Sequence, residues 1–196
     1  MLKKITRMLL LAVVATAVST GVKAQSAALK TNLLYDAAST INLGLEVGLA
    51  PKWTLDLSGN FNAWEVSGQL WKHWMLQPEA RYWFCDRFAG HFLGAHVLGG
   101  QFNIGKLNHT VDFFGQPFHI LEQNRAQGWA VGAGIAYGYA WILGKHWNLE
   151  AELGIGWIHS WYDVYDCKEC ESKIASDREH NYYGPTKAAI NLVYVF

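Results

Sequence analysis

The stretch Trp129-Ala-Val-Gly-Ala-Gly-Ile-Ala-Tyr-Gly-Tyr-Ala-Trp141 alternates two kinds of side chain without a break. Its odd-numbered positions carry Trp, Val, Ala, Ile, Tyr, Tyr and Trp, whereas its even-numbered positions carry only Gly or Ala. Neighbouring side chains of a β-strand point to opposite faces of the sheet. The stretch therefore predicts a strand with one bulky, apolar face and one nearly bare face.

The same period of two occurs in seven other segments, where apolar side chains alternate with polar or small ones. These segments are Leu29 to Asp36, Ile41 to Leu49, Trp53 to Asn62, Leu76 to Phe84, His91 to Ile104, Leu149 to Trp161 and Lys187 to Phe196. Pro78 disturbs the pattern in one of them, and glycines obscure the faces of the segment that begins at His91. The whole pattern predicts an all-β chain, an eight-stranded antiparallel transmembrane β-barrel whose apolar face meets lipid.

The composition favours the same class of protein. Aromatic residues make up 14% of the chain, which has ten Trp, 19 Gly and only four Pro, while the mean hydropathy is +0.02. This mixture is unusual for a water-soluble domain. A membrane barrel explains it, because its outside needs an apolar band with aromatic borders and its inside is polar.

The N-terminus has the three parts of a secretory signal peptide, residues 1–24. A basic start precedes an apolar run from Met8 to Val18 and a small-residue cleavage site that ends at Ala24. Residues 25–196 then form one domain, which we expect to have neither a membrane helix nor a lipid anchor. The signal carries four of the 16 Lys and Arg, so 12 remain against 16 Asp and Glu, a net charge of about −4 that favours no nucleic-acid partner.

Connections of alternating length indicate an outer-membrane location. The turns at 51–52, 86–90 and 144–147 are short, whereas the stretches 65–74, 106–127 and 163–183 are long and polar. Outer-membrane barrels have short periplasmic turns and longer external loops. The chain also ends on an apolar alternation that finishes at Phe196, which we expect the barrel assembly machinery to bind.

The two faces of the predicted strands have different roles. Outer-membrane lipid is the expected partner of the outer face, with an aromatic girdle of Trp53, Trp83, Trp147, Tyr35, Trp64, Trp129, Trp157 and Trp161. The inner face collects Lys30, Asp36, Glu46, Asp56, Glu79, Arg81, Glu150, Glu152 and Lys187. An eight-stranded barrel has room inside for side chains only, so these charges should pair and fill it, and a pore is not expected.

Binding candidates lie in the predicted outer loops. Trp71 and Trp74 are candidates in the first long stretch, and Cys167, Cys170 and His180 in the last. The pair Cys167 and Cys170 has three open interpretations: a loop-stiffening disulfide, which we favour, a free dithiol, or a metal site with His180. We accordingly expect no resident metal and no cofactor.

No catalytic residues are predicted. His159 and Ser160 resemble part of a lipid-editing triad, but adjacent strand residues face opposite sides and cannot exchange a proton. Histidines such as His91 and His96 show no ligand spacing and are expected at the surface or in the aromatic girdle. We expect a chain that is not an enzyme, with a lipid-modifying outer-membrane enzyme as the alternative.

Several segments resemble a family of small outer-membrane proteins from gut and oral anaerobes, known as a domain of unknown function. They are Lys30 to Asp36, Lys52 to Ser58, Gln77 to Phe84 and Gly184 to Ala189, of which Pro-Glu-Ala-Arg-Tyr-Trp and Gly-Pro-Thr-Lys are the most specific. The family often occurs near fimbrial genes, so the resemblance implies a structural or interaction role at the cell surface with a surface or fimbrial protein. It implies no catalytic residues.

Overall fold

The computed structural model describes residues 26–66, 69–105, 124–165 and 173–196. They form one antiparallel sheet of eight long strands, which confirms the all-β prediction. The strands are β1 (Ala27–Asn32), β2 (Ile41–Ala50), β3 (Trp53–Asn62), β5 (Gln69–Trp83), β6 (Gly90–Gly105), β7 (Arg125–Ile142), β8 (Trp147–Tyr165) and β9 (Lys173–Val195). A two-residue strand, β4 (Glu65–Val66), pairs with the start of β5, and a short helix, α2 (Leu33–Ala37), follows β1.

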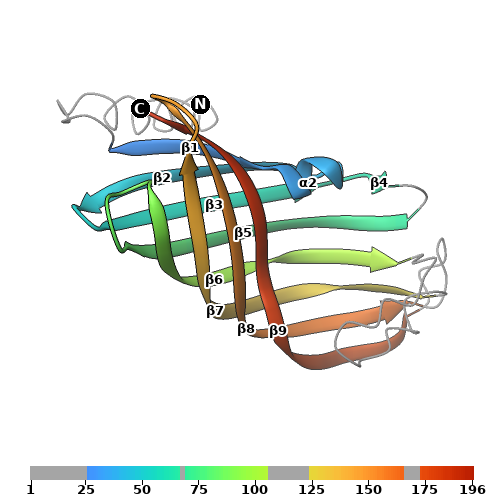
Figure 1. Cartoon of the computed structure of the whole chain (residues 1–196). Helices are drawn as coiled ribbons and strands as arrows, with labels where there is room; N and C mark the ends of the chain where they lie inside the picture. Colours follow the sequence, from blue (N-terminus) through green and yellow to red (C-terminus); the bar gives the residue numbers. More distant parts are fainter. Residues whose placement is uncertain (1–25, 67–68, 106–123, 166–172) are drawn as a thin grey trace, which may run out of the picture.

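The sheet closes on itself (Figure 1). Its strand order is β3-β2-β1-β9-β8-β7-β6-β5, and β3 also pairs with β5 from Trp53 opposite Tyr82 to Asn62 opposite His73. The first and last strands pair as well, with Ala28 opposite Val195. Each long strand therefore has two hydrogen-bonded neighbours, and among the described residues none of these strands forms an open edge.

The two ends of the closed sheet differ. At one end, called here the terminal end, the backbone N–H of Phe196 donates to the carbonyl of Ala27 at 2.9 Å. The connections between β2 and β3, β5 and β6, and β7 and β8 also lie there, as expected for the short turns. The opposite end, called the α2 end, carries α2 and β4 (Figure 1).

The burial of side chains is inverted relative to a water-soluble domain. Leu153 is 71% exposed and Ile135 63%, whereas Arg81 and Glu46 are 0% exposed. Along β3 the exposed and buried residues alternate, with Leu55 and Leu57 outside and Thr54 and Asp56 inside. The middle of the interior is polar and charged, and the outer face is apolar.

The predicted strand from Leu29 to Asp36 is wrong in its second half. Asn32 ends β1 because its side-chain Oδ1 accepts a hydrogen bond from the backbone N–H of Leu34 at 3.1 Å and caps α2. Asp36 consequently lies on α2, exposed, where it accepts hydrogen bonds from Thr31 and Asn42. It is not among the interior charges, contrary to the prediction. No helix within the described ranges is long and apolar enough to cross a membrane.

Two of the long polar stretches predicted as loops are largely strand. Residues 65–66 and 69–74 belong to β4 and β5, and residues 163–165 and 173–183 belong to β8 and β9. The prediction failed because polar and apolar residues do not alternate regularly in these extensions, so the hydrophobic period is lost although the backbone pairing continues. The third stretch, 106–127, contains the start of β7, and its residues 106–123 lie outside the described ranges.

The glycines of β7 make room for side chains of β6. A Cβ at Gly134 would lie 2.7 Å from Nε2 of His96, and one at Gly138 would lie 2.2 Å from Cζ of Phe92. Both distances are below normal contact. The Gly and Ala face of β7 thus points to the interior, where it meets the buried side chains of β6. The outer face of β6 carries Leu93 and Val97.

Candidate functional site

A buried cluster of charges occupies the middle of the closed sheet, with Arg81 of β5 at its centre. Its guanidinium group contacts five carboxylates, which come from four strands. The N···O distances are 2.9 Å to Glu46, 3.1 Å to Asp56, 2.6 Å to Glu79, 3.1 Å to Glu150 and 2.7 Å to Glu152. One side chain therefore ties β2, β3, β5 and β8 together across the interior.

Two lysines complete the cluster from β1 and β9. Lys30 contacts Glu46 and lies 3.2 Å from Glu150, and Lys187 lies 2.8 Å from Glu79 and 3.1 Å from Glu152. All eight of these charged residues were predicted inside from the alternation of their strands. The carboxylates outnumber the three bases among them, so the pairs are shared rather than separate.

His96 of β6 also belongs to the interior. It was expected at the surface or in the aromatic girdle, and that prediction is wrong. Its Nδ1 lies 3.4 Å from Oε2 of Glu79, and its Nε2 lies 2.9 Å from Oγ1 of Thr186. Gly94 and Gly99 hid the period of β6. The sequence did contain a signal for the interior position. His96 lies two residues from Gly94 and four from Phe92, so all three residues share one face of β6.

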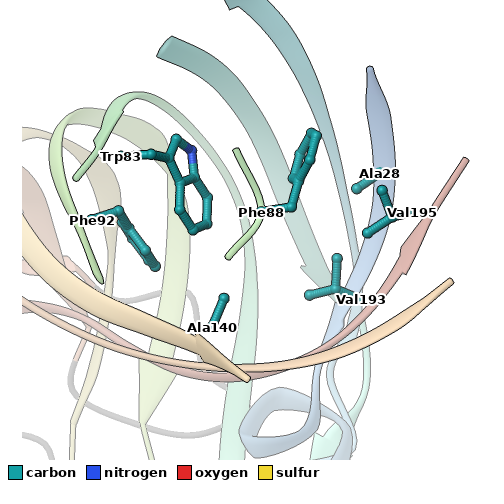
Figure 2. Close-up of a cluster of buried hydrophobic side chains, with 7 residues drawn as sticks. All are labelled: Ala28, Trp83, Phe88, Phe92, Ala140, Val193 and Val195. Carbon is teal, nitrogen blue, oxygen red and sulfur yellow. The ribbon is translucent and has the colours of Figure 1, made fainter. Parts of the chain in front are cut away.

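An apolar group fills the terminal end of the interior (Figure 2). It consists of Ala28, Trp83, Phe88, Phe92, Ala140, Val193 and Val195. The rings of Trp83 and Phe92 lie 4.7 Å apart between centroids, and the Arg81 guanidinium carbon lies 4.6 Å from the Phe92 ring centre. This apolar plug adjoins the charge cluster directly.

The place of Trp83 corrects a prediction. It was expected in the outer aromatic girdle, but it is fully buried and two residues from Arg81 on the same face of β5. The other predicted girdle residues are not fully buried: Tyr35 lies on α2, and Trp53, Trp129 and Trp147 are each about half exposed on the outer face.

The aromatic binding candidates lie in a strand and not in a loop, which is a second correction. Trp71 and Trp74 both belong to β5. Trp74 donates from Nε1 to Oε1 of Gln101 at 2.8 Å, and its ring packs edge-on against Trp129 at 5.6 Å. Trp74 forms part of the outer face near the α2 end. Trp71, three residues away along β5, shares the opposite face with His73, and the two rings lie 6.4 Å apart.

Of the remaining candidates, the structure describes His180, His159 and Ser160. His180 lies in β9 opposite Ser160, whose hydroxyl donates to the His180 carbonyl at 3.4 Å, and Cys167 and Cys170 lie outside the described residues. On the outer face, Nδ1 of His159 lies 2.8 Å from Oδ1 of Asn181, and the amide oxygen is the acceptor of this hydrogen bond. In the described ranges no three His, Cys, Asp or Glu side chains are grouped as metal ligands.

Comparison with known proteins places the chain in a family. The model of a family described as "Protein of unknown function (DUF3575)" matches residues 8–196. The chain belongs to the DUF3575 family. No curated protein and no solved structure matches it. The resemblance to a family of unknown function is confirmed, and the role of this DUF3575 chain must be argued from its own geometry.

The interior of this DUF3575 protein is built to hold strands together. Each carboxylate of the cluster has a basic partner, and a buried charge whose partner is removed costs several kcal/mol. Hydroxyl groups and amides extend the network, since Asn191 donates to Glu150 at 2.7 Å and Thr54 donates to Glu46. Because these side chains occupy the interior, other molecules have access mainly to the outer surface and the two ends.

Proposed function

We propose that the chain is an eight-stranded transmembrane β-barrel of a bacterial outer membrane with a non-enzymatic, structural or interaction role at the cell surface. The observation that carries the proposal is the inversion of the two faces: a closed sheet with an apolar outside and a charged, filled inside. Lipid offers no hydrogen bonds to backbone groups, so a sheet that crosses it must close on itself.

The spacing of the outer aromatic side chains along β7 supports the proposal, because the apolar outer face between them is tall enough to span a membrane. Trp141 and Trp129 lie on the outer face of β7, twelve residues apart, and are 45% and 50% exposed. Twelve residues of strand extend about 40 Å, or about 30 Å of height at a tilt of roughly 40°. Outer-membrane barrels have an apolar band about 25 Å tall between aromatic girdles.

The filled interior supports a role other than conduction. Arg81 and its partners occupy the middle, and the apolar plug occupies the terminal end. One observation favours the alternative, a lipid-modifying enzyme: His159 faces outward with Nε2 3.9 Å from Oε2 of Glu179. Ser160, the nearest hydroxyl in sequence, lies on the opposite face of β8 and cannot be its nucleophile.

The α2 end offers the surface for a partner. β8 and β9 are the longest strands, of 19 and 23 residues, and together form a hairpin that extends past Trp161 to Tyr165 and Lys173. Exposed loops and their supporting strands carry binding residues more often than a buried scaffold does. We infer that this hairpin contacts a surface protein, for which a fimbrial component is the candidate.

Photo-crosslinking in intact cells tests the proposal. A crosslinking amino acid at Ser176 or Arg178, both exposed in β9, should capture a surface protein. The same group at Lys145, in the turn between β7 and β8, is the matched control at the opposite end and should not capture it. A chain that fractionates away from the outer membrane, or equal capture from both ends, would reject the proposal.

A further inference from the structure

A hollow of about 450 Å³ lies on the outer face near the α2 end, across β3, β5, β6, β7 and β8. Strand register places two rows of its side chains one above the other. The row nearer the terminal end is mainly aromatic, with Phe61, Trp74, Gln101 and Trp129 as neighbours. The row nearer the α2 end is mainly polar, with Ala63, Lys72, Asn103, Gln127 and Asp163.

The aromatic row forms a fixed wall. The hydrogen bond from Trp74 Nε1 to Gln101 Oε1 holds the indole of Trp74 in one orientation, at right angles to that of Trp129. An indole ring offers a flat apolar face with a polar edge. The C–H face of a sugar ring packs well on such a surface, while its hydroxyl groups can bond to amides beside it.

The polar row supplies the groups that a charged sugar needs. Lys72 makes no ion pair within the described ranges, and Oδ1 of Asn103 is buried without a hydrogen-bond partner there. Asp163 is already paired, since Lys173 donates to it at 2.8 Å and holds the pKa of that carboxyl below its usual range. Among the described residues that line it, the hollow therefore presents the unpaired cation of Lys72 and the unpaired acceptor of Asn103, and a buried acceptor without a hydrogen bond is costly.

The hollow opens toward the apolar part of the outer face. Gly99 lies two residues before Gln101, on the same face of β6, and a Cβ at Gly99 would meet only the carbonyl oxygen of Ala130, at 4.0 Å. Its cross-strand neighbours Leu76 and Val131 are exposed. A ligand with a sugar in the hollow could continue as an acyl chain over Gly99.

We propose that this hollow binds the headgroup of an anionic glycolipid of the outer leaflet, an acylated sugar that carries phosphate. Lys72 contacts the anionic group, Asn103 and Gln127 bond to hydroxyl or amide groups, and Trp74 and Trp129 pack against the sugar ring. The inference rests on the membrane location proposed above and deepens it by naming the lipid partner.

Native mass spectrometry of the folded protein in detergent tests the assignment, with purified lipopolysaccharide as the probe. The wild type should bind one molecule of lipopolysaccharide more tightly than any further molecules of it. Lys72→Gln and Trp74→Ala should each weaken its binding about tenfold. Lys145→Gln and Trp147→Ala, which change the same residue types at the terminal end, should leave binding unchanged. Equal affinity in all five proteins would overturn the proposal.

Two further probes separate the sources of affinity. Deacylated lipopolysaccharide, which keeps the phosphosugar, should bind in the hollow but more weakly, and its binding should still depend on Trp74. Phosphatidylglycerol, an anionic lipid without that sugar, should bind at least tenfold more weakly than lipopolysaccharide. Equal binding of phosphatidylglycerol would show recognition of charge alone and would also overturn the proposal.

The folded state of each variant is checked by its heat-dependent shift on gels, and Trp74→Phe provides a milder change if Trp74→Ala does not fold. Proteins that fold and reach the outer membrane but show no selective lipid would refute this inference alone. A wild-type protein that never reaches the outer membrane would instead refute the proposed function.

Discussion

The indole Nε1 of Trp83 donates a hydrogen bond of 2.9 Å to Oγ1 of Thr54, deep inside the closed sheet. The Thr54 hydroxyl donates in turn to Glu46, which pairs with Arg81. The apolar plug and the charge cluster are therefore joined by a chain of hydrogen bonds. Such a chain fixes the orientation of each member, because every buried polar group in it has a partner.

Replacement of Trp83 with Ala should lower the free energy of unfolding by about 3–5 kcal/mol, the usual cost of deleting a large buried ring. Urea titration of the protein folded in detergent measures it. Trp53→Ala is the matched control, because Trp53 is half exposed on the outer face of the neighbouring strand. Similar losses for the two variants would contradict the burial of Trp83 inside.

Arg81→Leu should be at least as damaging, because it leaves the carboxylates around it short of a positive charge. The expected loss is about 3–5 kcal/mol, measured by the same titration. Arg178→Leu, an equal change at an exposed position of β9, should stay within about 0.5 kcal/mol of wild type. If Arg81→Leu matches Arg178→Leu, the cluster does not hold the strands together.

Purified protein in planar lipid bilayers should show no stable conductance steps. The charge cluster fills the middle of the interior and the apolar plug fills the terminal end. Single-channel recording is the measurement, with a known porin in the same chamber as the positive control. Reproducible, well-resolved steps from the wild type would disprove the filled interior.

Phe196→Asp should sharply reduce the amount of assembled protein, seen as loss of the heat-modifiable band. Phe196 is exposed at the end of β9, beside the pairing of β9 with β1, where a machinery that inserts barrels would bind. Phe196→Tyr keeps a terminal aromatic ring and should assemble normally. Normal assembly of Phe196→Asp would count against the membrane barrel.

Deletion of the gene should leave the mass spectrum of lipid A unchanged. The outward-facing His159 has Asn181 and Glu179 beside it, while Ser160 lies on the opposite face of β8. A shift by one acyl chain that returns with the wild-type gene but not with His159→Ala would establish the enzyme instead.

The strand pattern could be predicted wherever one face is apolar. Trp53 to Asn62 was predicted with the bounds that β3 has, and Glu46, Asp56 and Arg81 were placed inside by alternation alone. Asp36 was misplaced because one side-chain hydrogen bond from Asn32 turned the chain into a helix. A period of two carries no information about such a local cap.

Other features were beyond the pattern for different reasons. Trp83 was assigned by residue type, although its position two residues from Arg81 already indicated the interior. The extension of β8 and β9 has polar residues on both faces, so only backbone pairing reveals it. The outer hollow depends on register across five strands, which no single segment of sequence contains.

The bare inner face of β7 has a consequence for how this strand tolerates change. Its conspicuous residues, such as Ile135 and Tyr137, face outward and should exchange for other apolar residues with little loss. Gly134 and Gly138 have no side chain, yet an added methyl group would collide with His96 or Phe92. In a survey of all substitutions in β7, replacements of the inward-facing Gly134 and Gly138 should therefore lower stability more than apolar replacements of the larger, outward-facing Ile135 and Tyr137.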